Sequence, residues 1–145
     1  MNQDNIYTMF LRIITEYEYL DFSEDELMEE FMEILCMAVP EVQLQGVCED
    51  LGCDVDFGLS HDVDVQSAYI LAHACVLIWV LPKVNSSEML AYALTSTDFT
   101  LFSPANRLQA CMKLQAEVQA KLNHLINDYH SRSVMSEMKK QVDGN

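Results

Sequence analysis

The most reactive side chains of this sequence gather between residues 48 and 64. Two thiols, Cys48 and Cys53, precede His61 in this stretch. Thiolate sulfur and imidazole nitrogen are common zinc ligands, so the segment is a candidate zinc site. The cysteine spacing is wide for such a site, however, and a fourth ligand would have to come from Asp62 or from a distant part of the chain. The spacing therefore argues against zinc.

The same segment carries four aspartates that resemble a calcium-binding loop, namely Asp54, Asp56, Asp62 and Asp64. An EF-hand loop needs glycine at its sixth position and a bidentate glutamate at its twelfth. Counted from Asp54, these positions hold Leu59 and Val65, so the match fails. A metal-dependent enzyme that uses these acids stays an alternative function, and the same spacing weakens it.

A second pair of reactive side chains, His73 and Cys75, falls in an apolar helical stretch. Residues two apart on a helix point to different faces, which disfavours a catalytic pair and favours a hydrogen-bonded core histidine. Five cysteines are an odd number without a dense framework, as is typical of reduced core thiols. No phosphate-binding glycine loop and no G-x-S-x-G or H-E-x-x-H motif occurs. We therefore predict that the protein is not an enzyme and uses no metal or cofactor.

Charge is distributed unevenly along the chain. Residues 1–64 hold 17 acidic residues and one basic residue, whereas residues 65–145 hold six acidic and seven basic residues. The acidic half would repel nucleic-acid phosphates, so we expect no sequence-specific nucleic-acid binding. This half is interpreted either as a solubilising surface or as one that lies near DNA or a basic partner without adhering to DNA.

The hydrophobic periodicity predicts an all-α fold: about five helices in a bundle with one long C-terminal helix. We assign residues 1–130 to a helical domain and residues 131–145 to a polar tail, disordered unless docked. The first helix spans about 5–19, with Asp4 as its cap. The second begins at a capping box, Ser23 to Glu26, and stops before Pro40.

Residues 40–64 break the periodicity and are interpreted mostly as a surface connection, with a helical turn around Val42 to Leu51 as an open alternative. The third helix spans about 65–81 and ends at Pro82; its apolar run is too short and too mixed to span a bilayer comfortably, so no membrane association is expected. A second capping box, formed by Asn85 with Glu88, begins a fourth helix that reaches about Leu94.

A loop over 95–102, anchored by its own aromatic side chains, leads into the last helix. Ser103 followed by Pro104 is typical of a helix start, and the helix reaches Tyr129 or beyond. Such a helix is longer than the others can cover, so it protrudes or packs on a neighbouring subunit. The side chains expected to be largely buried are Leu27, Phe31, Ile34, Tyr69, Leu77, Trp79, Leu108, Leu122 and Leu125.

Four stretches in fixed order resemble a group of small structural proteins of tailed bacteriophages. They are IITEYEYLDFSEDEL, IWVLPKVNSSEML, STDFTLFSPANRL and the long helix ending in LINDYHSRS, and they cover about residues 6–133. These proteins are the head–tail connector, neck or adaptor components. The glycine- and cysteine-containing stretch 46–58 departs from their pattern.

The resemblance implies a virion protein of the neck, present in the host cytoplasm during assembly. It implies a ring, usually of twelve subunits, that sits beneath the portal protein, contacts a further neck or tail protein and lets DNA pass. The partner-binding candidates are Leu122, Leu125, Ile126, Tyr129, Arg132, Lys139 and Lys140. The acidic candidates that would face DNA are Glu24, Asp25, Glu29, Glu30 and Glu33.

A different class of function fits the same acidic composition. An inhibitor that mimics DNA would place its carboxylates like phosphates on one convex face and occupy the nucleic-acid-binding cleft of a host protein. It would act as a monomer or dimer, whereas a connector forms a ring.

Overall fold

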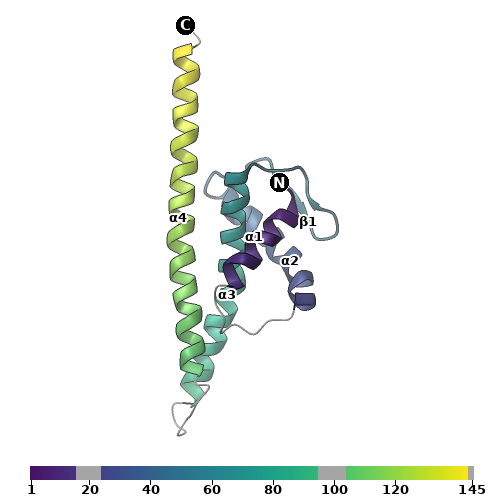
Figure 1. Ribbon diagram of the computed structural model, residues 1–145, viewed down its shortest axis with the longest axis vertical. Coiled ribbons are helices and arrows are strands. Elements are labelled where there is room, and N and C mark those ends of the chain that lie inside the picture. The colour runs from purple at the N-terminus through teal and green to yellow at the C-terminus, as the bar shows by residue number, and fades with distance from the viewer. Residues whose placement is uncertain (16–23, 95–103, 144–145) are drawn as a thin grey trace.

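The computed structural model describes residues 1–15, 24–94 and 104–143. Within these ranges the chain forms four helices and one antiparallel strand pair (Figure 1). The elements, in chain order, are α1 (Gln3–Thr15), α2 (Glu24–Gln43), β1 (Cys53–Asp54), β2 (Gly58–Leu59), α3 (Val65–Leu94) and α4 (Pro104–Asp143). The predicted helical character and long C-terminal helix are confirmed, but the five-helix count is not, and the strand pair departs from an all-α fold.

Three predictions fall outside the described residues. They are the capping side chain of Ser23, the anchored loop 95–102 and the cap at Ser103.

Side-chain caps fix the beginnings of α1 and α3. The Oδ1 atom of Asn2 accepts the backbone N–H groups of Asp4 (3.0 Å) and Asn5 (3.3 Å), and the Asn5 side chain accepts the N–H of Asn2 (3.0 Å). This reciprocal arrangement is a capping box, so the prediction of Asp4 as the cap is wrong. At α3, Oδ1 of Asp64 accepts the N–H of Ser67 at 2.9 Å.

Helix α3 continues through Pro82 to Leu94, so the predicted end at Pro82 and the separate helix 86–94 are wrong. Proline lacks the N–H that would bond to the carbonyl one turn earlier, which usually kinks or ends a helix. Here Trp79 and Val84 lie on either side of the proline and are both buried. Their burial on one continuous helix offsets the lost hydrogen bond.

Helix α2 likewise runs through Pro40 to Gln43, beyond its predicted end. Val39 and Val42 flank this proline and are buried, which gives the same physical reason. The helix ends at Gln43, and a turn follows in which Gly46 has a φ of +76°, a conformation that suits glycine best.

The connection after α2 is more deeply packed than a surface loop. Val47 and Leu51 are buried in the core. The side-chain amide of Gln43 donates hydrogen bonds to the carbonyls of Cys48 (3.0 Å) and Leu51 (2.7 Å). The prediction that this part of 40–64 is a surface connection is therefore wrong. The Gln43 side chain satisfies two backbone carbonyls of the connection, so this stretch can pack against the core without regular secondary structure.

A two-residue strand pair follows, with Cys53 opposite Leu59 and Asp54 opposite Gly58. Oδ1 of Asp54 accepts the backbone N–H groups of Asp56 (2.8 Å) and Phe57 (3.1 Å), which closes the turn. Gly58 has a φ of +82°, and Phe57 at the tip is 85% exposed.

The core lies where α1, α2 and α3 meet. Phe10 is fully buried at its centre, and its ring lies 5.3 Å from that of Phe31 and 5.9 Å from that of Trp79, between centroids. Lys83 places its Nζ 4.3 Å from the Trp79 ring centroid, a cation–π contact on the outer side.

Most of the predicted core residues are at least partly buried. Phe31, Ile34, Trp79 and Leu122 are buried, and Leu77, Leu108 and Leu125 are partly buried. Tyr69 is 43% exposed, so its predicted burial is wrong. Val65, one turn earlier, is exposed as well, so this strip of α3 lies uncovered. The side chain of Leu27 lies outside the described residues.

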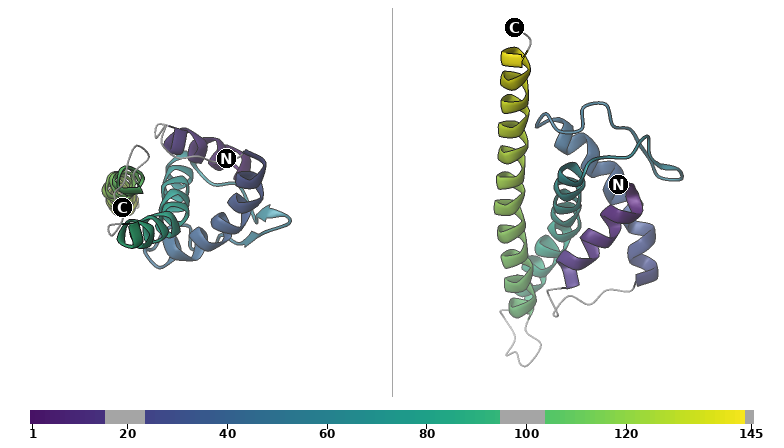
Figure 2. Two further views of the ribbon diagram at one scale, coloured as in Figure 1. Left: turned by 90° about the horizontal axis from the view of Figure 1, so that it is seen from below. Right: turned by 45° about the horizontal axis from the view of Figure 1, so that its top comes forward.

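Helix α4 stands beside α3 and extends past the rest of the molecule at its C-terminal end (Figures 1 and 2). Its packing against α3 buries Cys111, Leu114 and Val118. Further along, Nε2 of His130 donates a hydrogen bond to the carbonyl of Gln45 at 2.7 Å and joins α4 to the end of α2.

Helix α3 contains the one segment among the described residues, Val65–Asn85, that is long and apolar enough to cross a membrane. The length argument against a span therefore fails. Within the candidate window, 61% of the residues are buried inside the protein, and neighbouring helices surround it. This burial supports the interpretation of α3 as the central core helix.

Candidate functional site

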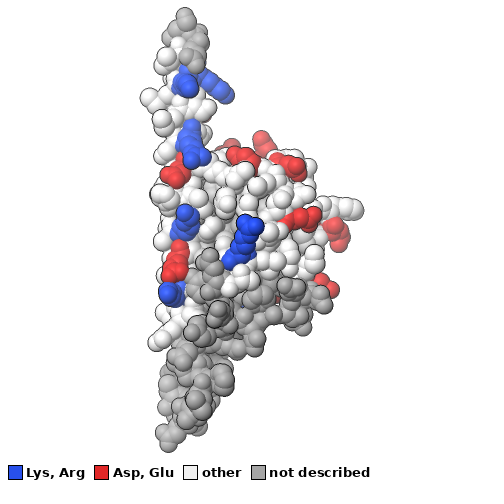
Figure 3. All heavy atoms as spheres, in the orientation of Figure 1, with Lys and Arg blue, Asp and Glu red and all other residues white. Residues whose placement is uncertain are grey.

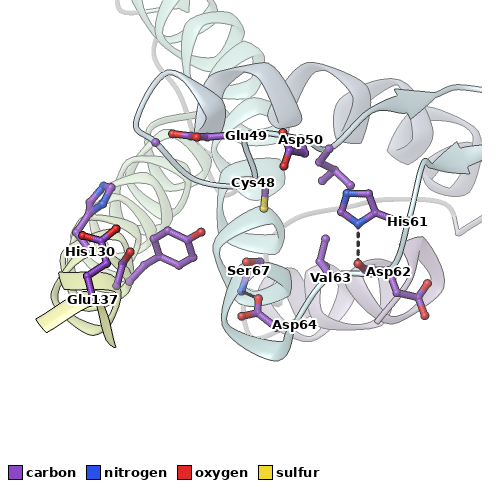
Figure 4. A pocket seen from close by; sticks show the side chains of 14 residues that line it. Cys48, Glu49, Asp50, His61, Asp62, Val63, Asp64, Ser67, His130 and Glu137 are labelled. Carbon is purple, nitrogen blue, oxygen red and sulfur yellow. Dashed lines mark hydrogen bonds between the residues drawn. The ribbon is translucent and has the colours of Figure 1, made fainter. Parts of the chain in front are cut away.

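An open cleft of about 600 Å³ lies between α4 and the segment that connects α2 to α3 (Figure 4). Its far wall is the beginning of α3 at Ser67, and its α4 wall includes Tyr129 and His130. Five carboxyl side chains line it: Glu49, Asp50, Asp62, Asp64 and Glu137. The cleft is therefore acidic.

The thiol in this cleft, Cys48, is poorly suited to nucleophilic chemistry. Burial raises its pKa, a hydrogen bond from Ser67 lowers it in part, and the charge of Asp64 raises it further. A thiol with a raised pKa carries little thiolate at neutral pH, and thiolate is the nucleophile. The nearby His61 is exposed, and its Nδ1 bonds instead to the carbonyl of Asp62 at 2.8 Å.

The zinc and calcium hypotheses gain no support from the described residues. No group of three or more His, Cys, Asp or Glu side chains there is placed to hold a metal ion. Cys53, one of the proposed zinc ligands, lies against Cys36. The carboxylate of Asp54, proposed for calcium, accepts backbone hydrogen bonds in the strand turn.

His73 is a buried histidine with a structural hydrogen bond. It is 8% exposed, and its Nδ1–H donates to the carbonyl of Tyr69 at 2.7 Å. Burial lowers its pKa below the ordinary 6.5; the Tyr69 bond opposes this shift, and the charge of Lys121 adds to it. The neutral ring is therefore favoured, as expected of a core histidine.

The predicted partner-binding residues on α4 divide into two groups. Leu122 and Ile126 are buried within this chain's own core, and Leu125 and Tyr129 are packed against it. Leu122 and Ile126 therefore form no free partner surface, whereas Tyr129 is partly exposed in the wall of the acidic cleft. The remaining three, Arg132, Lys139 and Lys140, are exposed.

An exposed apolar face occupies the last turns of α4, and the predicted site did not include it. Its residues are Val134 (54% exposed), Met135 (69%), Met138 (60%) and Val142 (75%). We call these four residues the α4 tip face. Three of them repeat every fourth residue, which places them on one side of the helix. This spacing can be seen in the sequence, but the prediction of a polar tail over 131–145 did not include an apolar helix face.

The segment 131–143, expected to be a tail disordered unless docked, forms the last turns of α4 in the structure. Residues 131–142 are all exposed. An isolated helix of this length gains little from its own hydrogen bonds. Its ordering by a partner therefore stays a prediction.

Acidic and basic side chains are separated between the body and α4. Helix α4 holds six basic and four acidic residues, whereas the other 105 residues hold two basic and 19 acidic residues. On the face shown in Figure 3, basic side chains lie mainly along α4, and acidic ones gather on the body.

Three of the predicted DNA-facing acids can be placed on the surface. Glu29, Glu30 and Glu33 are exposed on α2. The side chains of Glu24 and Asp25 lie outside the described residues. The structure therefore places an acidic face on α2 and a basic, apolar tip on α4.

Comparison with known proteins gives no further identification. No family model matches the chain, and neither the curated proteins nor the solved structures contain a match.

Proposed function

We propose that this protein is a structural assembly subunit of the virion neck of a tailed bacteriophage, forming a head–tail connector ring beneath the portal. The observation that carries the proposal is the protruding end of α4, which combines the α4 tip face with exposed basic residues. The bacteriophage assignment itself comes from the sequence resemblance.

We expect a partner molecule to cover the α4 tip face in the functional assembly. Four large apolar side chains, each at least half exposed, lie together on one helix, and contiguous apolar patches of this kind mark interaction surfaces. The segment 131–143 is about 20 Å long at 1.5 Å per residue, which is enough to reach across a neighbouring molecule. A role in assembly would explain why α4 extends beyond the helices of its own chain.

Charge separation favours a second copy of the chain as the first partner. Arg132, Lys139 and Lys140 complement the acidic body of a neighbour, which would steer encounter and fix register. The donor surface, the α4 tip, differs from the acceptor surface, the body. Such a heterologous contact generates a ring where the rotation closes. We propose a ring of twelve subunits, with the portal and a further neck or tail protein as its other partners.

The acidic face of α2 is proposed to border the DNA channel. Carboxylates such as Glu29, Glu30 and Glu33 repel phosphates within roughly one Debye length, about 8 Å at physiological salt. DNA would be guided through the ring without being bound. The proposal therefore includes no sequence-specific nucleic-acid binding, no membrane association and no catalysis.

The test uses purified full-length protein, alone and with portal-bearing heads. Subunit number is measured by mass photometry, rings are sought by negative-stain imaging, and completion of heads by added tails is scored as infectivity. We expect rings on the heads. The double variant Met138→Ser, Val142→Ser and a truncation after His130 should keep the helical body and lose attachment at least tenfold.

The matched control is Met112→Ser, because Met112 is 52% exposed on the same helix but lies outside the tip. It should attach normally. Normal attachment of the truncated protein would exclude the α4 tip as the assembly surface. If the full-length protein does not bind the portal but binds basic nucleic-acid-binding proteins as a monomer, the DNA-mimic function is favoured over the connector function.

A further inference from the structure

Two cysteines from different elements meet at the edge of the core. Cys36 lies on α2 and Cys53 in β1, 17 residues apart in the chain, and their sulfur atoms are 2.6 Å apart. A covalent S–S bond is about 2.05 Å long, so the sulfurs lie within about half an ångström of bonding distance. Both side chains are only partly buried, so small reagents can reach them.

The other three cysteines are placed differently. Burial raises the pKa of Cys75 on α3, and the nearby charges of Cys53 and Cys36 raise it further. Cys75 thus lies near the pair but is fully buried, and Cys111 is buried on α4. Cys48 lies in the acidic cleft and bonds to Ser67. The contact between Cys36 and Cys53 therefore singles out one pair from the five thiols.

We propose that Cys36 and Cys53 form a reversible intramolecular disulfide when the protein meets an oxidised thiol such as oxidised glutathione. The bond would fasten β1, and with it the strand turn, to α2. That turn presents Val55 (49% exposed) and Phe57 (85% exposed). The disulfide would thus fix the position of an exposed apolar tip on the body. The inference does not depend on the proposed connector function, because it concerns only this chain's own thiols.

The reaction proceeds by two thiol–disulfide exchanges. One protein thiol loses its proton, and its thiolate attacks a sulfur of oxidised glutathione; the glutathione S–S bond breaks, and one glutathione thiolate leaves. The second protein thiolate then attacks the protein sulfur of this mixed disulfide and expels the second glutathione. Two protein thiols are oxidised, and one oxidised glutathione is reduced to two thiols that take up the two protons.

The environment of the pair sets the speed of this reaction. Burial raises the pKa of Cys53 to about 12, and its hydrogen bond and charge interaction with Cys36 contribute to the shift. Because little of this thiol is ionised at neutral pH, oxidation should be slow there and accelerate as the pH rises. A reducing cytoplasm would keep the pair as thiols, and an oxidising medium would close it.

The experiment incubates the full chain with reduced or with oxidised glutathione, removes the reagent and counts thiols after denaturation. We expect the count to fall from five to three, with a mass loss of about 2 Da and no dimer on a non-reducing gel. Closing a loop of this size should raise the Tm of the oxidised protein by about 10 °C over the reduced protein. Trypsin cannot separate the relevant cysteines, since residues 13–82 contain no lysine or arginine, so the linkage is mapped after cleavage at glutamate.

Single variants identify the pair. Cys36→Ser and Cys53→Ser should each form no intramolecular disulfide: at most one thiol is lost, as a mixed disulfide with glutathione, and the Tm difference disappears, whereas Cys48→Ser should still lose two thiols. A constant thiol count in the unmodified chain, or a mapped disulfide that uses Cys48, Cys75 or Cys111, would overturn the proposal. The unmodified chain decides the question even if a variant folds poorly.

Discussion

Shortening Ile126 to alanine should destabilise the protein by about 3 kcal/mol, because it removes three carbons from the contact between α4 and the body. Ile126 is 5% exposed and belongs to the continuous core. Substitutions of this kind in a packed core typically cost about 2–5 kcal/mol, which includes the cavity left behind. The position lies where α4 begins to leave the body, so partial relaxation places our value in the lower half of that range.

The assay is urea unfolding at 25 °C followed by far-UV circular dichroism, with a parallel thermal scan. For a chain of this size, about 3 kcal/mol corresponds to a fall in Tm of about 10 °C. Met138→Ala is the matched control on the same helix. Met138 is 60% exposed, so its loss should change the free energy of unfolding by less than about 0.5 kcal/mol.

The two variants should reverse their order in the assembly assay. Ile126→Ala, studied well below its Tm, should still attach to portal-bearing heads. Met138→Ala should attach less well, because Met138 belongs to the α4 tip face. Equal stability losses in the two variants would refute the docking of α4 on α3 as described. Equal attachment defects would remove the distinction between the buried face of the helix and its exposed tip.

Three further predictions concern single residues. The pKa of His73 is lowered below 6.5, so between that lower pKa and 6.5 the unfolded chain binds more protons than the folded one. The free energy of unfolding should therefore fall as the pH drops from 6.5. Urea titrations at each pH measure this slope, which His73→Gln should flatten. Gly58→Ala should cost about 1–2 kcal/mol, since φ is +82° and the new Cβ would meet the side chain of Gln3; an unchanged urea midpoint would contradict the left-handed turn. Asn2→Ala removes the α1 cap and should cost about 1 kcal/mol, whereas Asn2→Asp should retain most of the stability in the same urea titration.

Helical character and most of the core residues could be predicted from the sequence. Apolar side chains at helical spacing identified Phe31, Ile34 and Trp79 as core positions, and each of them is buried. This works because the spacing of side chains around a helix is a local property. The position of His73 as a hydrogen-bonded core histidine was predictable for the same reason, since its neighbours along the helix are apolar.

Boundaries at prolines could not be predicted, because local rules compete there with packing. Pro40 and Pro82 each remove a backbone hydrogen bond, and considered alone each ends a helix. The structure carries α2 and α3 past them, with buried side chains on both sides. Only contacts between distant segments supply the free energy that decides this competition.

The candidate sites depended even more on tertiary structure. The sequence by itself established an acidic N-terminal half, a long last helix and five cysteines, and the spacing of Cys48, Cys53 and His61 argued against zinc. Tertiary structure decided which side of α4 is buried, and it left the tip face uncovered. It also brought Cys53 against Cys36, because the strand turn folds back onto α2. The sequence gives the type of each residue, but helix packing decides which residues come into contact. That packing depends on the burial of the whole core.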